Sequence, residues 1–409
     1  MREDAGGCRP RCDAVRGGRP LFDYGAYNLG AQPSVILMFA ADRSERRSYA
    51  IIPYLRPRRG ALPPDPIVGA FVFPDFWENA GRANSNLAHL RDCGVNALMT
   101  ESDRYDLAAV EATHGAGLRF FAGVACFSDH AADFRSLKER PELWPILENG
   151  ERRPQMEWYV GQTPTDRRRR EEALAEIKSI ARTVPVDGIF LDFARWPLHW
   201  EIELRPGRER PLDSSFDAAT LAMFEAATGA LPRDLDTTSA RAAWIRRHRS
   251  AEWVEFKCKV VSDFVSEARK ALKETKADAA LGIYVVPDVG GLTEPLTGQR
   301  TKDLAPLVDW IAPMLYHNIL LQPPSWVASA LAPVAIVAGR KALPVLQADS
   351  NRDPAVADDW GPPMSDANWS EALSQVAGRS DIGGLIVFPG MALMGERGAS
   401  LRSMLGARR

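Results

Sequence analysis

The 409-residue sequence has few cysteines, few histidines and no long apolar run, and each shortage excludes a class of protein. Five cysteines, with no Cys or His pair to complete a zinc site beside Cys8 and Cys12, argue against a structural zinc centre. The six histidines form no H-x-H or H-E-x-x-H pair, which argues against a metal-dependent hydrolase. No uncharged apolar segment approaches the ~20 residues of a membrane helix. A net charge of -2 makes a nucleic-acid partner a poor expectation.

Several sequence motifs of cofactor-dependent and serine enzymes are also missing. No G-x-G-x-x-G follows the first expected strand, and no G-x-x-x-x-G-K-[ST] occurs, so we expect no nucleotide and no other cofactor. No G-x-S-x-G is present, which excludes the serine nucleophile of lipases. The apolar run Val35–Ala41 begins late and has no small-residue cleavage site after it. We therefore expect a cytoplasmic location, with secretion as the alternative if the start codon is misplaced.

The chain changes character after residue 62. Residues 1–62 are rich in Arg, Gly and Pro and show little periodicity, so we expect an irregular N-terminal extension. Residues 63–409 alternate short apolar runs with helical stretches, which predicts one (β/α)₈ barrel with long loops after the third and fourth strands. An open doubly wound sheet is the alternative. The eight expected strands are Ile67–Phe73, Val95–Thr100, Leu118–Cys126, Val186–Asp192, Ala280–Val286, Val308–Leu315, Ala342–Gln347 and Ile382–Phe388.

Polar and aromatic residues follow the expected strands, and in such a barrel these positions share one rim that carries the active site. Carboxylates follow five of the eight strands, with aromatic residues between them, as a saccharide-binding cleft requires. We expect this rim to bind substrate through Asp75, Trp77, Glu101, Asp103, Tyr105, Arg195, Trp196, Tyr316, His317, Gln347 and Asp349.

Asp192 is the strongest single candidate, because it ends a continuous apolar strand and Arg195 follows three residues later. A neighbouring positive charge favours the ionised form of a carboxyl group. That state suits a nucleophile or a group that stabilises an oxocarbenium ion. The alternative is a structural Asp–Arg pair that fastens the loop.

Two longer segments resemble those of a known family. The run VDGIFLDFARWP at Val186–Pro197 resembles the D-G/E-I-x-x-D-[YF]-x-R-[FW]-P motif of a group of uncharacterised glycoside hydrolase barrels. Gly298 and Gln299, followed by Leu304–His317, are similar to that group's G-Q…V-D-[YW]-I-x-P-M-x-Y segment. The group lies near the α-amylase clan and glycoside hydrolase family 18. Shorter likenesses are found at Thr100–Tyr105, Asp288-Val289, Leu343–Asp349 and Gly383–Phe388.

The resemblance implies a (β/α)₈ barrel that acts on glycosidic bonds. The family 18 pattern has its catalytic glutamate where Ala194 stands, so we do not expect that family's substrate-assisted mechanism. We expect a glycoside hydrolase or transglycosylase whose partner is a polysaccharide or oligosaccharide. The alternative is a catalytically inactive barrel that binds carbohydrate.

The second catalytic carboxylate is assigned to Asp288, in the apolar run Val285–Gly290. Removal from water raises the pKa of a carboxyl group, so Asp288 is expected to be the general acid and Asp192 the ionised partner. Because their strands are neighbours, the pair is expected to be close enough for retention of anomeric configuration.

Overall fold

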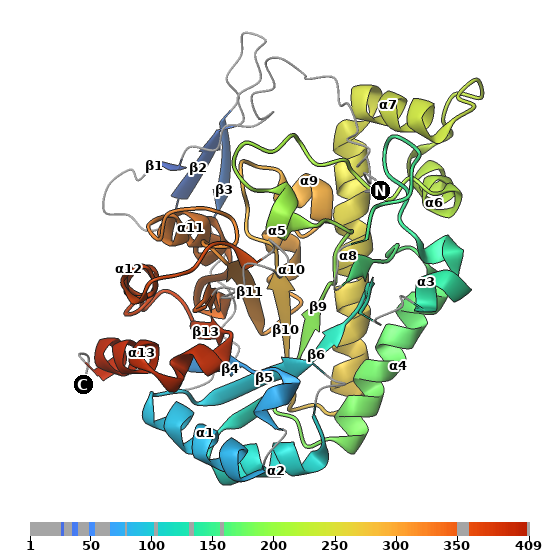
Figure 1. Cartoon of the computed structure of the whole chain (residues 1–409). Coiled ribbons are helices and arrows are strands. Elements are labelled where there is room, and N and C mark those ends of the chain that lie inside the picture. The colour runs from blue at the N-terminus through green and yellow to red at the C-terminus, as the bar shows by residue number, and fades with distance from the viewer. Residues whose placement is uncertain are drawn as a thin grey trace, which may run out of the picture. The chain divides into compact units, whose positions relative to one another are not determined.

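The computed structural model describes residues 26–27, 35–39, 49–53, 66–77, 80–101, 105–130, 135–155, 159–349 and 360–406 (Figure 1). The chain divides into two units, Met1–Pro63 and Pro64–Arg409. The first unit contains an antiparallel sheet in the order β1-β2-β3, with bounds Ala26–Tyr27, Val35–Phe39 and Tyr49–Pro53. We expected irregular chain here, so these strands are a departure from that expectation.

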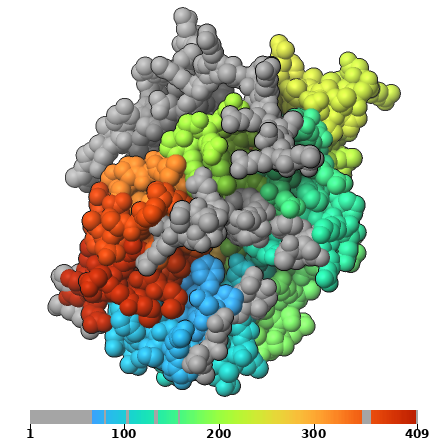
Figure 2. Space-filling model, in the orientation of Figure 1, coloured from blue at the N-terminus to red at the C-terminus, as the bar shows by residue number. Residues whose placement is uncertain are grey.

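The second unit is a closed barrel of eight parallel strands, as the sequence predicts, and the open sheet is excluded. The strands close in the order β4-β5-β6-β9-β10-β11-β12-β13, because β13 pairs with β4. Figure 2 shows this closure on the surface, where early blue segments lie against late red ones. The bounds are Ile67–Phe71 (β4), Ala97–Glu101 (β5), Arg119–Ala125 (β6), Gly188–Asp192 (β9), Ala280–Val285 (β10), Trp310–Leu315 (β11), Val345–Gln347 (β12) and Gly384–Phe388 (β13).

The strands read as continuous apolar runs because both of their faces are buried. Alternate side chains point outward against the helices or inward into the lumen. The lumen is filled by large rings and small partners: Phe190 stacks on Trp310 with ring centroids 6.3 Å apart and meets Phe121 edge-on at 5.7 Å. A Cβ atom at Gly282 would collide with the Phe190 ring, so glycine is required there. The lower lumen is therefore a packed core.

Helices surround the strands (Figure 1). Within the described residues, no helix is long and apolar enough to cross a membrane. The α-helices are α1 (Ala80–Asp92), α2 (Leu107–Gly115), α3 (Arg135–Glu139), α4 (Arg167–Thr183), α5 (Trp200–Glu203), α6 (Ala218–Thr228), α7 (Thr238–His248), α8 (Ser250–Thr275), α9 (Thr293–Thr297), α10 (Thr301–Leu304), α11 (Trp326–Ala338), α12 (Asp366–Ser374) and α13 (Glu396–Gly406). The 3₁₀ turns are η1 (Pro74–Phe76), η2 (Pro141–Leu143), η3 (Gly339–Lys341) and η5 (Gly390–Met394).

Capping residues and apolar stripes explain where the helices begin and how they pack. The Asp166 carboxylate accepts a hydrogen bond from the Arg169 N–H at 2.7 Å and so caps α4. Asp217 does the same for α6 through the Thr220 N–H at 2.9 Å. Helix α8 buries one side between Trp253 and Leu272, where the sequence predicts an apolar stripe.

Two connections are long, after β6 and after β9, as the sequence predicts. The first carries α3, η2 and a two-stranded sheet of β7 (Ser128–Asp129) and β8 (Val160–Gly161) before α4 begins. The second carries α5, α6 and α7 before α8. Both leave from carboxyl ends of strands, so they build the face of the barrel on which active sites occur.

Candidate active site

At the carboxyl ends of the strands, the last inward-facing residues form a polar and aromatic layer above the packed lumen. We call this layer the mouth of the barrel. On β9 the inward series runs through Phe190 to Asp192, and on β5 it ends at Glu101. The same alternation brings Tyr284, Tyr316 and Phe388 into this layer. Residues far apart in the sequence thus meet at one end of the barrel.

A tight turn after β9 holds the carboxyl group of Asp192. Phe193 has φ of 49°, a left-handed conformation that is unfavourable for a residue with a Cβ atom. This turn lets the Phe193 N–H donate to Oδ1 of Asp192 at 2.7 Å. The backbone carbonyl of Asp192 accepts from the Cys126 N–H at 2.8 Å. The Phe193 N–H therefore holds the carboxyl group, and the bond from Cys126 holds the backbone that carries it.

The protonation of Asp192 differs from the sequence-based expectation. Burial raises the pKa of this carboxyl group to about 6, and this effect exceeds the lowering by the Phe193 N–H and by the charge of Arg195. Arg195 is itself 3% exposed; its Nη1 donates to the Leu198 carbonyl at 2.9 Å, and its guanidinium lies 5.0 Å from the Phe193 ring centroid. A carboxyl group that keeps its proton up to about pH 6 suits a general acid better than a nucleophile.

Glu101 ends β5 and is separated from Asp192 by one strand. Strand β6 lies between them and presents Gly123 beside Glu101 and Ala125 beside Asp192. With strands ~4.8 Å apart, β5 and β9 lie about 10 Å apart across the sheet, and the register also offsets Glu101 from Asp192 by two residues along β6. Gly123 and Ala125, the inward-facing residues of β6 beside the two carboxylates, carry little side chain.

Tyr284 reaches the same space from β10. Its side chain is 4% exposed, and its hydroxyl has no hydrogen-bond partner among the described residues. Its pKa lies well above the ordinary value, because of burial first and then the negative charges of Asp192 and Glu101. The hydroxyl therefore stays protonated and lies within electrostatic range of both carboxylates.

A row of aromatic rings borders the mouth on the side of β4, β13 and β11. Trp360 stacks on Phe388 with centroids 5.4 Å apart, and Phe388 stacks on Tyr316 at 4.9 Å. Phe73 lies 6.3 Å from Trp360 at one end, and Trp200 lies 5.5 Å from Tyr316 at the other. Phe73, Trp360 and Phe388 are half-buried, so part of each ring faces solvent. We call these five residues the aromatic row.

The connection after β9 contributes Trp200 to this row and further side chains next to it. Trp200 in α5 belongs to the same buried cluster as the lumen residues. Behind it, the Tyr159 hydroxyl lies 3.2 Å from Oε2 of Glu201 and 3.1 Å from the Leu198 carbonyl oxygen, and these two acceptors share its one hydrogen. Burial, followed by charges that include Asp192 and Glu201, raises the pKa of Tyr316 well above its ordinary value. Glu201 is 6% exposed and brings a third carboxylate near the site.

Asp288 does not have the apolar surroundings that the sequence predicts. The residue is exposed beyond the end of β10. Its carboxylate accepts hydrogen bonds from the N–H groups of Gly291 and Thr293, each at 3.2 Å, which fastens the turn before α9. The expectation of a buried acid is therefore wrong about the environment, since proximity to Pro287 and Val289 in sequence did not exclude water.

Four expected substrate-binding residues are engaged elsewhere. Trp196 is fully buried and its Nε1 donates to the Lys257 carbonyl at 3.1 Å, away from the mouth. Trp77 and Tyr105 pack against the core between strands and helices, and Tyr105 meets the Phe120 ring edge-on at 4.9 Å. Gln347 faces the lumen, but it accepts from the Ile319 N–H at 2.9 Å and donates to the carbonyls of Asp349 at 2.8 Å and Trp360 at 3.1 Å. It positions Trp360.

The remaining expected residues have mixed surroundings. Asp75 is exposed on η1, and Asp103 lies outside the described residues. Asp349 accepts from Nη1 of Arg397 at 2.9 Å. His317 is 1% exposed, neither of its ring nitrogens has a partner within the described part of the chain, and burial lowers its pKa to about 4. His317 is therefore neutral near pH 7.

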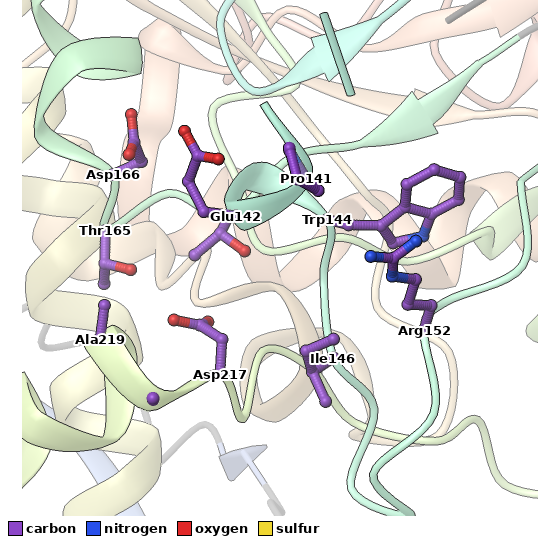
Figure 3. A pocket seen from close by; sticks show the side chains of 11 residues that line it. Pro141, Glu142, Trp144, Ile146, Arg152, Thr165, Asp166, Asp217 and Ala219 are labelled. Carbon is purple, nitrogen blue, oxygen red and sulfur yellow. The ribbon is translucent and has the colours of Figure 1, made fainter. Parts of the chain in front are cut away.

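A separate pocket of about 400 Å³ lies between η2 and the starts of α4 and α6 (Figure 3). Its aspartates are already used, because Asp166 and Asp217 cap helices and Asp166 also pairs with Arg140 at 2.6 Å. The guanidinium of Arg152 lies 5.2 Å from the Trp144 ring centroid and covers that ring. The pocket therefore offers neither a free acid nor an open aromatic face.

No three His, Cys, Asp or Glu side chains of the described residues are grouped as metal ligands. The cysteines described, Cys93, Cys126 and Cys258, are buried and unbridged.

A family match accompanies this geometry. Residues 96–329, more than half of the chain, match the model of a family described as "putative glycosyl hydrolase domain". The chain belongs to this family. The match confirms the resemblance at the level of family and barrel, while the narrower links to the α-amylase clan and family 18 stay predictions. Among curated proteins, no sequence matches the chain.

Solved structures of glycosidases share the fold of this family member. The glycoside hydrolase domain of PgaB (BpsB) from Bordetella bronchiseptica is 15% identical, with a TM-score of 0.60 over 84% of this chain and 99% of that chain. The catalytic domain of β-amylase from Paenibacillus polymyxa is 11% identical, with a TM-score of 0.56 over 85% and 100%. A β-galactosidase from Marinomonas ef1 is 12% identical, with a TM-score of 0.56 over 83% and 59%. At such identities the likeness shows the fold alone.

Sequence analysis missed Tyr284, Trp360, Phe388 and Glu201 as residues of the mouth. Tyr284 carries a usable signal, because a hydroxyl inside a buried strand ordinarily needs a partner. Phe388 could have been found from the same inward alternation that places Asp192. Trp360 and Glu201 lie in connections between strands, and no local sequence pattern predicts the path of these connections.

Proposed function

We propose that the protein is a glycoside hydrolase that cleaves O-glycosidic bonds of a polysaccharide or oligosaccharide at the mouth of its barrel. The observation that supports this most is the presence of two carboxyl side chains, Asp192 and Glu101, at the same end of the barrel as the aromatic row. Sugar rings have apolar faces that stack on aromatic rings, and their hydroxyls bind carboxylates. The pKa of about 6 at Asp192 supplies the protonated group that bond cleavage needs.

In the proposed reaction, Asp192 donates its proton to the glycosidic oxygen as the bond from that oxygen to the anomeric carbon breaks. Glu101 takes a proton from a water molecule, whose oxygen forms the new bond to the anomeric carbon from the opposite face. Reprotonation of Asp192 and release of the Glu101 proton to solvent complete the cycle. Two strand spacings between the carboxylates favour this inverting arrangement, since inverting pairs lie ~6.5–9.5 Å apart and retaining pairs ~5–5.5 Å. This replaces the expected retention by neighbouring strands.

Reducing-end release from a polysaccharide panel tests the proposal. Wild type should hydrolyse at least one polysaccharide, and Asp192→Asn and Glu101→Gln should each lower its turnover by about 10²–10⁴-fold. Asp278→Asn is the matched control, because Asp278 is an exposed aspartate just before β10, at the opposite end of the barrel. Circular dichroism confirms that each variant is folded.

Three other outcomes would contradict parts of the proposal. If Asp288→Asn abolishes turnover while Glu101→Gln does not, the acid–base pair is assigned incorrectly. If wild type binds a polysaccharide and never cleaves it, the protein is the inactive carbohydrate-binding barrel. If wild type neither binds nor cleaves any member of the panel, the proposed function is wrong.

A further inference from the structure

Among the described residues, the buried hydroxyl of Tyr284 at the mouth has no hydrogen-bond partner. A buried hydroxyl without a hydrogen bond destabilises the folded state by roughly 1–3 kcal/mol, so proteins ordinarily pair such groups. Tyr284 is 4% exposed, lies near the carboxyl end of β10 and has no such partner among the described residues. Its hydroxyl can therefore still donate a hydrogen bond to a ligand.

The ring contacts of Tyr284 show that its hydroxyl points into the mouth. The ring packs on Phe190 with centroids 5.1 Å apart and meets Phe71 edge-on at 6.5 Å, which fixes its inward direction. The hydroxyl lies near enough to Asp192 and Glu101 to respond to their charges, yet it makes no hydrogen bond with either. The separation is thus longer than a hydrogen bond, so the hydroxyl hydrogen is not taken up by either carboxylate.

We propose that Tyr284 is a substrate-contacting residue whose hydroxyl donates a hydrogen bond to an oxygen of the sugar ring held between Asp192 and Glu101. This inference rests on the proposed function. Donation from a fixed, protonated hydroxyl holds the sugar at the level of the two carboxylates, with its anomeric carbon between acid and base. The Tyr284 hydroxyl then acts on positioning for bond cleavage and adds no stabilising hydrogen bond to the unliganded fold.

Tyr284→Phe separates these two effects, because it removes only the hydroxyl and keeps the ring. We expect kcat/KM on the best polysaccharide of the panel to fall by about 10–100-fold, mostly through kcat, which is the loss of one substrate hydrogen bond in a buried site. The melting temperature without ligand should stay within about 1–2 °C of wild type or rise, since no protein hydrogen bond is lost. Tyr105→Phe is the matched control, since its ring packs on Phe120 between strand and helix, away from the mouth.

The results distinguish three cases. A fall in the melting temperature by more than about 4 °C, with kcat/KM per folded molecule unchanged, gives Tyr284 a structural role and overturns the inference. Turnover within twofold of wild type at an unchanged melting temperature also overturns it, and leaves the proposed glycosidase function intact. Absence of hydrolysis by wild type across the panel overturns the proposed function, and this inference with it.

Discussion

Replacing Asp192 by asparagine should stabilise the protein at neutral pH while removing its activity. The folded chain holds the pKa of this carboxyl group at about 6, compared with 3.8 for an unperturbed aspartate. A difference of about two pKa units corresponds to about 3 kcal/mol. Because part of the Asp192 surface reaches solvent, that figure is an upper limit. Asparagine keeps an oxygen for the Phe193 N–H and carries no charge to desolvate.

The destabilisation by Asp192 has a defined pH window. Between pH 3.8 and about 6, the folded state binds more protons at this site than the unfolded state, so wild-type stability falls as the pH rises. Above about pH 6 the full penalty is present, and below 3.8 both states are protonated and it disappears. The advantage of Asp192→Asn should therefore grow from near zero at low pH to its maximum above neutrality.

Urea unfolding of wild type and Asp192→Asn in steps from acidic to neutral pH measures this difference. The reasoning predicts that the variant is more stable by up to about 3 kcal/mol above neutral pH. Asp278→Asn, in an exposed side chain, should show no comparable trend. A variant that is less stable than wild type at neutral pH, or an offset that does not change with pH, would refute the desolvated-acid interpretation.

Three further predictions concern the pH profile, a buried ion pair and the aromatic row. The kcat/KM of wild type should decline above about pH 6, as Asp192 loses its proton, and a profile flat to pH 8 would contradict that assignment. Asp213→Ala should lower the free energy of unfolding by about 3–5 kcal/mol, because it leaves the fully buried Lys257 ammonium without its counter-charge, whereas Lys259→Ala, in an exposed pair, should change it by less than about 1 kcal/mol. Trp360→Ala should raise KM about tenfold with little change in kcat, by removing a stacking face; an unchanged KM would exclude the aromatic row from binding.

The fold was predictable because burial on both faces leaves an unmistakable pattern. Strands such as β9 and β10 read as continuous apolar runs, and helix α8 shows its stripe at helical spacing. The order of the strands then follows from the right-handed connections between parallel neighbours. Antiparallel strands β1 to β3 were not predicted, since Arg, Gly and Pro dominate the composition around them.

The candidate site was predictable only in part. Asp192 and Glu101 were found because strand ends and alternation fix where their side chains lie. The surroundings of Asp288 and Gln347 were not predicted, because their hydrogen bonds are made to loop backbone, and the path of a loop is not visible in the sequence. The raised pKa of Asp192 could not be predicted either, since it depends on how far burial outweighs the charge of Arg195.

Proton NMR of the first-formed sugar product tests the central claim most directly. If Asp192 and Glu101 act as acid and base across a water molecule, with strand β6 between them, the fresh reducing end has the anomeric configuration opposite to that of the cleaved bond. The spectrum is recorded within the first minutes, before mutarotation mixes the anomers. A product that first forms with inverted configuration is the result predicted here. Retained configuration would contradict the water-mediated pair, because it requires a carboxylate close enough to bond the sugar itself.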